Sequence, residues 1–250
     1  MAYKAIIFDL FRTVILLSPE APTMRVTEPS WRPAMAALRG PVEQALPGVP
    51  FDRFLDALVA ATAEIVRERP PEYYEVPLRE RYRRALVRLG RDGSGAEAIS
   101  EHLSLLQMQQ LVMHSALPPA HLTLLHTLAP RYRLGVLSNF DHAPTVRRIL
   151  SRHGISNLFT VTLISDEFGR RKPHPSIFRE ALRRLDTAAG DTLYIGDSFV
   201  EDVQGAAAVG MDSAWINHAA AVAPAPGPQP RYVFTTVTDV GTVLAPGQPA

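Results

Sequence analysis

The spacing of the hydrophobic positions changes along the chain and divides it into regions. Residues 4–8 form a short apolar run that ends in an acid, a pattern typical of a buried strand. Residues 14–30 contain several prolines and have no clear period. From residue 31 to about 115, apolar residues recur at helical spacing, which predicts a block of roughly four helices. The clearest of these are expected over residues 51–69, 78–89 and 96–114.

After residue 118, short apolar runs alternate with segments of helical period. Strands that alternate with helices of about ten residues are typical of βαβ units and predict a parallel sheet. We therefore expect an α/β fold with a helical insertion after its first strand. The predicted strands are 133–137, 160–164, 192–195, 213–216 and 232–235, and the predicted helices are 121–128, 145–153, 176–185 and 202–209.

Composition excludes several classes of function. The 250 residues suffice for one large α/β domain, or for a core with a smaller accessory domain. A net charge of +1 gives no electrostatic reason to expect binding to nucleic acid or to an acidic membrane surface. The absence of Cys excludes thiolate chemistry and fits a reducing, cytoplasmic location. The first apolar run is too short for a signal peptide or a membrane span.

Polar residues that suit phosphoryl chemistry follow the predicted strands. They are Asp9, Ser138, Lys172 and the pair Asp197 and Asp202. Because the carboxyl ends of parallel strands open on one crevice, these residues can share a site despite their separation in sequence. A carboxylate can act as a nucleophile, further carboxylates can hold Mg²⁺, and Lys and Ser can bind phosphate oxygens.

Each of these residues also has an ordinary structural interpretation. Asp9 can be a helix cap or turn residue, Ser138 and Asn139 can cap a turn or helix, and Lys172 can lie in an exposed basic loop. Asp197 and Asp202 can be cap and surface charges. Their order along the chain and their placement after strands favour a shared site.

Four segments together resemble the motifs of the haloacid dehalogenase superfamily, whose members mostly transfer phosphoryl groups. The first, with its apolar strand and Asp9, is similar to Asp-x-Asp-Gly-Thr, and the third is similar to Lys-Pro-x-Pro-x-x-Phe. The four segments are Ile6–Thr13, Leu134–Asn139, Gly169–Phe178 and Tyr194–Ala206. The resemblance implies a Rossmann-like core over residues 1–16 and 118–250, with a helical cap domain over 17–117. Hinges between the two are expected near 18–30 and 116–120.

The resemblance also implies a mechanism. Asp9 would attack phosphorus and form an aspartyl-phosphate, and Ser138 would hydrogen-bond the phosphoryl oxygens. Lys172 would neutralise charge on Asp9 and on the phosphate. Mg²⁺ would be the cofactor, and Asp202 would orient Lys172 or a metal-bound water. The metal ligands implied are Asp9, the Phe11 backbone carbonyl, Asp197 and Asp202, and the residues implied to contact substrate are Phe11, Arg12, Thr13 and Asn139.

Two positions depart from the family's pattern. Phe11 stands where the family's phosphatases carry a second Asp that protonates the leaving group, and Arg12 stands where they carry Gly. A positioned acid or base contributes about 10²- to 10⁴-fold to a rate, so hydrolysis of ordinary alkyl phosphates should suffer. Arg12 is expected either to contact substrate or to form a salt bridge with a carboxylate.

Three functions therefore stay open at this stage. The first is a phosphatase that acts on a small phosphorylated metabolite, as a monomer or homodimer. The second is a 2-haloacid dehalogenase, because that branch also lacks the second Asp and usually has an aromatic residue there; Gly196-Asp197 argues against it. The third is a non-catalytic member that binds a phospho-ligand or a protein. In the helical block, the segment Arg79–Arg84 is interpreted as a solvated helix face.

Overall fold

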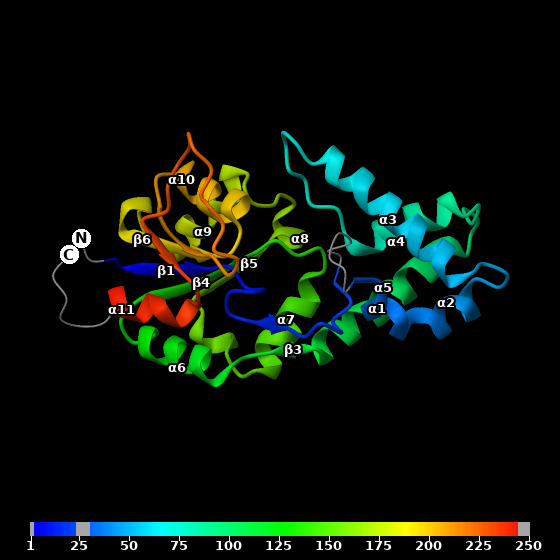
Figure 1. Cartoon of the computed structure of the whole chain (residues 1–250), viewed down its shortest axis with the longest axis horizontal. Helices are drawn as coiled ribbons and strands as arrows, with labels where there is room; N and C mark the ends of the chain where they lie inside the picture. Colours follow the sequence, from blue (N-terminus) through cyan, green and yellow to red (C-terminus); the bar gives the residue numbers. More distant parts are fainter. Residues whose placement is uncertain (1–2, 24–30, 245–250) are drawn as a thin grey trace.

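A six-stranded parallel sheet forms the centre of the larger part of the molecule (Figure 1). The computed structural model describes residues 3–23 and 31–244. The strand order is β5-β4-β1-β6-β7-β8, so the first strand lies in the middle and the order reverses beside it. The predicted α/β fold with a parallel sheet is confirmed. The strands are β1 (Ala5–Phe8), β4 (Arg133–Ser138), β5 (Val161–Ile164), β6 (Thr192–Gly196), β7 (Asp212–Ile216) and β8 (Tyr232–Phe234).

Helices cover both faces of the sheet, which explains why β1 is apolar at every position. Side chains alternate between the faces of a strand, so Ile6 and Phe8 pack on one side and Ala5 and Ile7 on the other. The first side is covered by α6 (Pro119–Leu128), α7 (Ala143–Arg152), η5 (Val237–Val240) and α11 (Gly241–Leu244). The second side is covered by α9 (Pro175–Leu185) and α10 (Gly205–Ala207).

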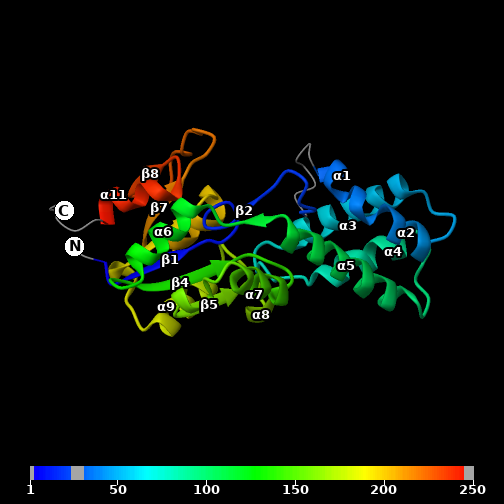
Figure 2. The same cartoon turned by 90° about the horizontal axis from the view of Figure 1, so that it is seen from below.

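A separate helical body lies beyond the carboxyl ends of the strands (Figures 1 and 2). Its own hydrophobic core includes Phe54, Leu58, Tyr82 and Leu103, each with no exposed surface. This agrees with the helical block predicted from the spacing of apolar residues. Its helices are α1 (Trp31–Ala34), η1 (Met35–Leu38), α2 (Arg39–Ala45), α3 (Phe51–Glu68), α4 (Leu78–Arg88) and α5 (Ala96–Met113). Among the described residues, no helix is both long and apolar enough for a membrane span.

Two short antiparallel strands connect the helical body to the sheet. They are β2 (Leu16–Leu17) and β3 (Ser115–Ala116), which no periodicity in the sequence had indicated. The predicted division at residues 16/17 and 117/118 falls at this pair of strands and stays a prediction. Part of the first predicted hinge, residues 24–30, lies outside the described residues.

The segment after β6 differs from the regular helix predicted over residues 202–209. It begins earlier, as the π-helical turn η4 (Phe199–Gln204), and continues only into the short α10. Ser198 caps this turn: its Oγ accepts a hydrogen bond from the N–H of Glu201 at 3.2 Å, and its own N–H donates to Asp202 Oδ2 at 2.8 Å. The wide turn directs the Asp202 carboxylate back toward the end of β6. A short helix that the sequence analysis missed, α8 (Ser165–Phe168), follows β5.

Gly196, the last residue of β6, leaves the space that Asp202 occupies. A Cβ at this position would lie 2.3 Å from Asp202 Oδ2 and 2.4 Å from its Cγ, which is well inside van der Waals contact. We therefore predict that Gly196→Ala lowers the free energy of unfolding by about 1–3 kcal/mol, because the core has to absorb the added methyl group. Urea denaturation followed by circular dichroism measures the change.

Gly190→Ala is the matched control, because a Cβ there meets nothing within 4 Å. An unfolding free energy of Gly196→Ala equal to that of the control would contradict the proposed close approach.

Candidate active site

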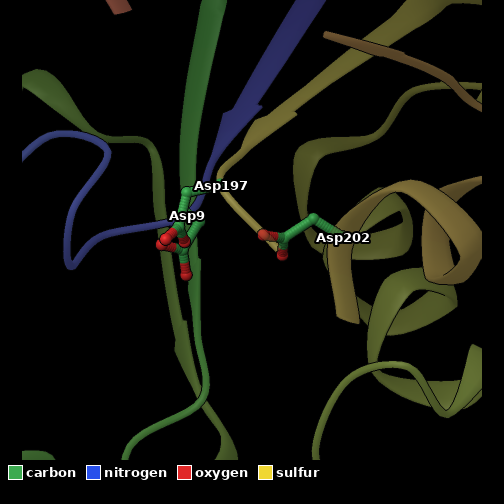
Figure 3. Close-up of side chains that lie close together, drawn as sticks. All are labelled: Asp9, Asp197 and Asp202. Carbon is green, nitrogen blue, oxygen red and sulfur yellow. The ribbon is translucent and has the colours of Figure 1, made fainter. Parts of the chain in front are cut away.

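The strand order brings the predicted site residues to one edge of the sheet. Asp9 directly follows β1, Ser138 ends β4, and Asp197 directly follows β6. Because β1 lies between β4 and β6, these three positions are neighbours at the carboxyl ends of adjacent strands. Figure 3 shows the carboxylates of Asp9 and Asp197 close together, with that of Asp202 turned toward them from the following segment.

Lys172 lies at the centre of this group, with 1% of its surface exposed. Its ammonium Nζ donates hydrogen bonds to Asp9 Oδ1 at 2.7 Å, to Asp202 Oδ1 at 2.7 Å and to the Tyr194 hydroxyl at 2.8 Å. Burial alone would lower the pKa of Lys172, but the carboxylates of Asp202 and Asp9 hold it well above its usual value. The lysine is therefore a fixed cation.

Asn139 fixes the backbone that carries this lysine. Its Nδ2 donates to the carbonyl of Lys172 at 3.0 Å, and its Oδ1 accepts from the N–H of Lys172 at 2.7 Å. The interpretation of Lys172 as part of an exposed basic loop is wrong, since these bonds hold it inside. Asn139 was predicted to bind substrate, and it also lines the cavity described below.

Tyr194 is a site residue that the sequence analysis did not identify. Its hydroxyl accepts from Lys172 and donates to Asp202 Oδ1 at 3.0 Å. Burial and the Asp202 carboxylate raise the pKa of Tyr194 well above its usual value, so the phenol keeps its proton. A signal was present, because a buried strand that is otherwise aliphatic contained one aromatic residue whose hydroxyl needs a partner.

Asp9 is buried and its charge is only partly compensated. Thr13 Oγ1 donates to Asp9 Oδ2 at 3.3 Å. Burial raises the pKa of Asp9 to about 7; Lys172 opposes this shift, and Asp202 and Asp197 add to it. A further cation beside these carboxylates would favour the ionised form of Asp9.

The donor set fits a hard divalent cation. Carboxylate oxygens of Asp9, Asp197 and Asp202 lie within 4.8 Å of one another, and Mg²⁺ prefers such oxygen ligands. The three are not equivalent, because the Asp202 side chain is 2% exposed, whereas those of Asp9 and Asp197 are 11% and 10% exposed. Asp9 and Asp197 thus offer the more accessible oxygens.

Arg12 supplies another positive charge at this point. Its Nε lies 3.2 Å from Asp197 Oδ2, which is the salt bridge expected as one of two alternatives for Arg12. The backbone at Arg12 has φ 67°, the left-handed region that favours glycine, which the family carries there. The carbonyl of Arg12 accepts a hydrogen bond from His218 Nε2 at 2.8 Å, assuming that this nitrogen carries the proton.

Ser138 has an unsatisfied hydroxyl. The residue is 1% exposed, and its Oγ has no hydrogen-bond partner among the described residues. Buried polar groups are almost always paired, and an unpaired hydroxyl costs free energy. A hydroxyl held this way at the carboxyl end of β4 is available to a ligand.

A cavity of about 640 Å³ lies beside this cluster, between the sheet and the helical body; Asp9, Ser138 and Lys172 do not themselves line it. A volume of this order suits a small molecule. Phe11 lines the cavity, as Arg12 and Asp197 do, and its ring packs against Phe140 with centroids 4.9 Å apart. No proton-donating side chain therefore stands at the position where the family's phosphatases place their second Asp.

The helical body contributes cations to this cavity. Arg69 and Arg81 both line it. Arg81 is 3% exposed and its Nη2 donates to Asp141 Oδ2 at 2.7 Å, so the interpretation of Arg79–Arg84 as a solvated face is wrong at this position. A signal was available, because Arg81 falls on the buried face of α4 beside Leu78 and Tyr82.

Comparison with known families agrees with this geometry. The sequence signature of the family described as haloacid dehalogenase-like hydrolase matches residues 56–216. The chain belongs to this family, which confirms the resemblance seen in its four motifs.

Three curated relatives are phosphatases by name. The chain is 35% identical to a glyceraldehyde 3-phosphate phosphatase of Pyrococcus abyssi, over 40% of this chain and 42% of the relative. It is 26% identical to the glyceraldehyde 3-phosphate phosphatase of Methanopyrus kandleri, over 83% of this chain and 81% of that relative. It is 26% identical to N-acylneuraminate-9-phosphatase of Rattus norvegicus, over 61% of each. The match to the first relative spans about two fifths of that relative's length.

Solved structures share the fold over the whole chain. A 2-haloacid dehalogenase of Pseudomonas syringae pv. Tomato superposes with a TM-score of 0.74 at 23% identity, covering 98% of this chain and 99% of the other. A HAD phosphatase of Thermococcus onnurineus superposes with a TM-score of 0.66 at 21% identity, covering 97% of this chain and 98% of the other. Because both identities are low, these similarities concern the fold alone.

Arg12 and a divalent cation should compete for Asp197. We predict that Arg12→Gly tightens Mg²⁺ binding by about 2- to 5-fold, the range expected for a partly exposed ion pair. Arg12 side-chain exposure is 42%, which is why the larger values of buried pairs do not apply. Isothermal titration calorimetry with MgCl₂ measures the dissociation constant.

Arg91→Gly is the control, because it removes one positive charge from the exposed loop between α4 and α5. An equal gain in both variants would mean that net charge, and not the Arg12–Asp197 contact, limits Mg²⁺ affinity.

Proposed function

We propose that the protein is a Mg²⁺-dependent phosphatase that hydrolyses a small phosphorylated metabolite through an aspartyl-phosphate on Asp9. The observation that carries this proposal is the cluster of Asp9, Asp197 and Asp202, in which the buried ammonium of Lys172 binds Asp9 and Asp202 and Asp197 lines a ligand-sized cavity. The phosphatase names of the relatives support the choice of substrate class.

Each residue has a defined part in the proposed reaction. The Asp9 carboxylate attacks phosphorus, the bond from phosphorus to the leaving oxygen breaks, and an acyl phosphate forms. Ser138 Oγ donates to a phosphoryl oxygen, which gives this buried hydroxyl the partner it lacks in the described residues. Lys172 offsets the charge that develops on the phosphoryl oxygens. Water then attacks phosphorus, releasing inorganic phosphate and restoring Asp9.

The proposed Mg²⁺ ligands are the carboxylates of Asp9 and Asp197 with the Phe11 backbone carbonyl. When bound, Mg²⁺ supplies positive charge that lets two anions, the nucleophile and the phosphate, approach each other. The proposed main part of Asp202 is to hold Lys172, because its side chain is only 2% exposed and accepts a hydrogen bond from the Lys172 ammonium. Thr13 orients Asp9 through its hydroxyl. A cytoplasmic location and a monomeric or homodimeric state stay predictions.

The nucleophile is tested directly. We predict that Asp9→Asn lowers kcat for p-nitrophenyl phosphate by more than about 10³-fold, because an amide cannot form the acyl phosphate. Asp186→Asn, at a fully exposed carboxylate, is the control and should keep wild-type activity. An unchanged rate in Asp9→Asn would exclude the proposed mechanism.

Phe11 determines which phosphates react well. We predict that Phe11→Asp raises kcat for ethyl phosphate by about 10- to 100-fold, because the ethoxide leaving group needs a proton to depart. Hydrolysis of p-nitrophenyl phosphate should change little, because p-nitrophenolate departs without one. Phe11→Asn is the matched control, since it removes the ring without supplying an acid. Equal gains in both variants would show that space, and not proton donation, matters.

A second candidate, 2-haloacid dehalogenation, is favoured by one observation. Phe11 places an aromatic ring on the cavity wall where a proton donor would stand, and a halide leaves without a proton. An assay of halide release from 2-chloropropionate, run with Mg²⁺ and with EDTA, separates the candidates. Release that persists in EDTA, without phosphatase activity, would select the dehalogenase.

A further inference from the structure

The cavity wall carries more positive than negative side chains. Among the described residues, its charged lining consists of four arginines and three carboxylates. Both the sheet side and the helical body supply arginines. The lining arginines are Arg12, Arg69, Arg81 and Arg171, and the lining carboxylates are Asp141, Asp197 and Glu201.

Three of the four arginines already have a carboxylate partner at short range. Each ion pair joins a guanidinium nitrogen to a carboxylate oxygen. The pairs are Arg12–Asp197 at 3.2 Å, Arg81–Asp141 at 2.7 Å, and Arg171 with Glu75 at 2.9 Å and Glu201 at 3.4 Å. These three arginines are therefore neutralised within the protein.

Arg69 is the exception. It follows α3 at the cavity wall, and no carboxylate among the described residues forms an ion pair with it. Its Nε is buried and has no hydrogen-bond partner in the part of the chain that the structure describes. Burial, and then the neighbouring Arg171, lower the pKa of Arg69 to about 10, so it stays charged at neutral pH.

A buried guanidinium nitrogen without a partner leaves a donor unsatisfied, and an anion would satisfy it. The planar guanidinium matches a carboxylate with two parallel hydrogen bonds. Arg69 is one cation without an ion-pair partner among the described residues, which a carboxylate balances, whereas a second phosphate would bring close to two negative charges. The same cavity wall also includes apolar residues, which suit a short carbon chain: Leu17, Val66, Met108, Leu111 and Phe140.

We propose that Arg69 binds a carboxylate at the end of the substrate opposite its phosphoryl group, so that the substrate is a phosphorylated carboxylic acid. This inference rests on the proposed phosphatase function for the location of the phosphoryl group at Asp9. A ligand bound in this way contacts the helical body and the sheet at once, because Arg69 belongs to the first and Asp9 to the second.

The experiment uses phosphonates, which bind but are not hydrolysed. ω-Phosphonocarboxylic acids of two to five carbons are compared with alkylphosphonates of the same length by calorimetry in the presence of Mg²⁺. For the best-fitting length, we expect the carboxylate to tighten binding by about 10- to 100-fold in the wild-type protein, as for a charged bidentate contact. In Arg69→Gln the two ligands should bind alike, and the alkylphosphonate should keep its wild-type affinity within about 3-fold.

Arg67→Gln is the matched control, because Arg67 is an exposed cation at the end of the same helix and does not line the cavity. It should keep the wild-type preference. If Arg69→Gln fails to fold by circular dichroism, Arg69→Lys replaces it and should lose most of the preference, since an ammonium lacks the planar pair of donors.

The proposal is overturned if the wild-type protein shows no preference at any length, or if the preference survives in the Arg69 variant. An equal loss in Arg67→Gln would also overturn it, because long-range charge would then explain the effect. Phosphonate binding with the expected preference but without phosphatase turnover would refute only the proposed function. Turnover of phosphate esters that lack a carboxylate, with no tighter binding of the ω-phosphonocarboxylic acids, would refute only the role of Arg69.

Discussion

The buried ammonium of Lys172 is the interaction on which the rest of the site depends. The ammonium donates hydrogen bonds to Asp9, directly after β1, and to Asp202, in the turn after β6. It also donates to the Tyr194 hydroxyl. Two carboxylates inside a protein repel each other and lose hydration, so they persist there only with a matching cation. In the proposed reaction the same lysine also offsets charge on the phosphoryl group.

Several backbone features follow from this constraint. Asn139 holds the Lys172 backbone from the end of β4, and the wide turn η4 directs Asp202 inward. Gly196 provides the space that the Asp202 carboxylate fills. The positions Phe11 and Arg12, where the chain departs from its family, line the cavity, and neither residue is a hydrogen-bond partner of the Lys172 ammonium.

The sequence predicted the fold to a large extent. The short apolar runs placed the strands β1 and β4 to β8 within about one residue, and helical spacing placed α3, α4 and α5 equally well. The strand pair β2 and β3 was not predicted, because two-residue strands carry no period. The helix expected over residues 202–209 begins earlier, at Phe199, where the side chains of Ser198 and Asp202 accept hydrogen bonds that hydrophobic spacing does not reveal.

The sequence by itself determined the family, the parallel sheet and the set of acids, hydroxyl and lysine at the strand ends, because these follow from the order of residues and from side-chain spacing. Only the tertiary structure decided which charges neutralise each other. It paired Arg12 with Asp197 and Arg81 with Asp141, and it left Arg69 without a carboxylate among the described residues. The reason is physical: an ion pair depends on distance in space, and residues separated by 60 or more positions meet only when the chain folds.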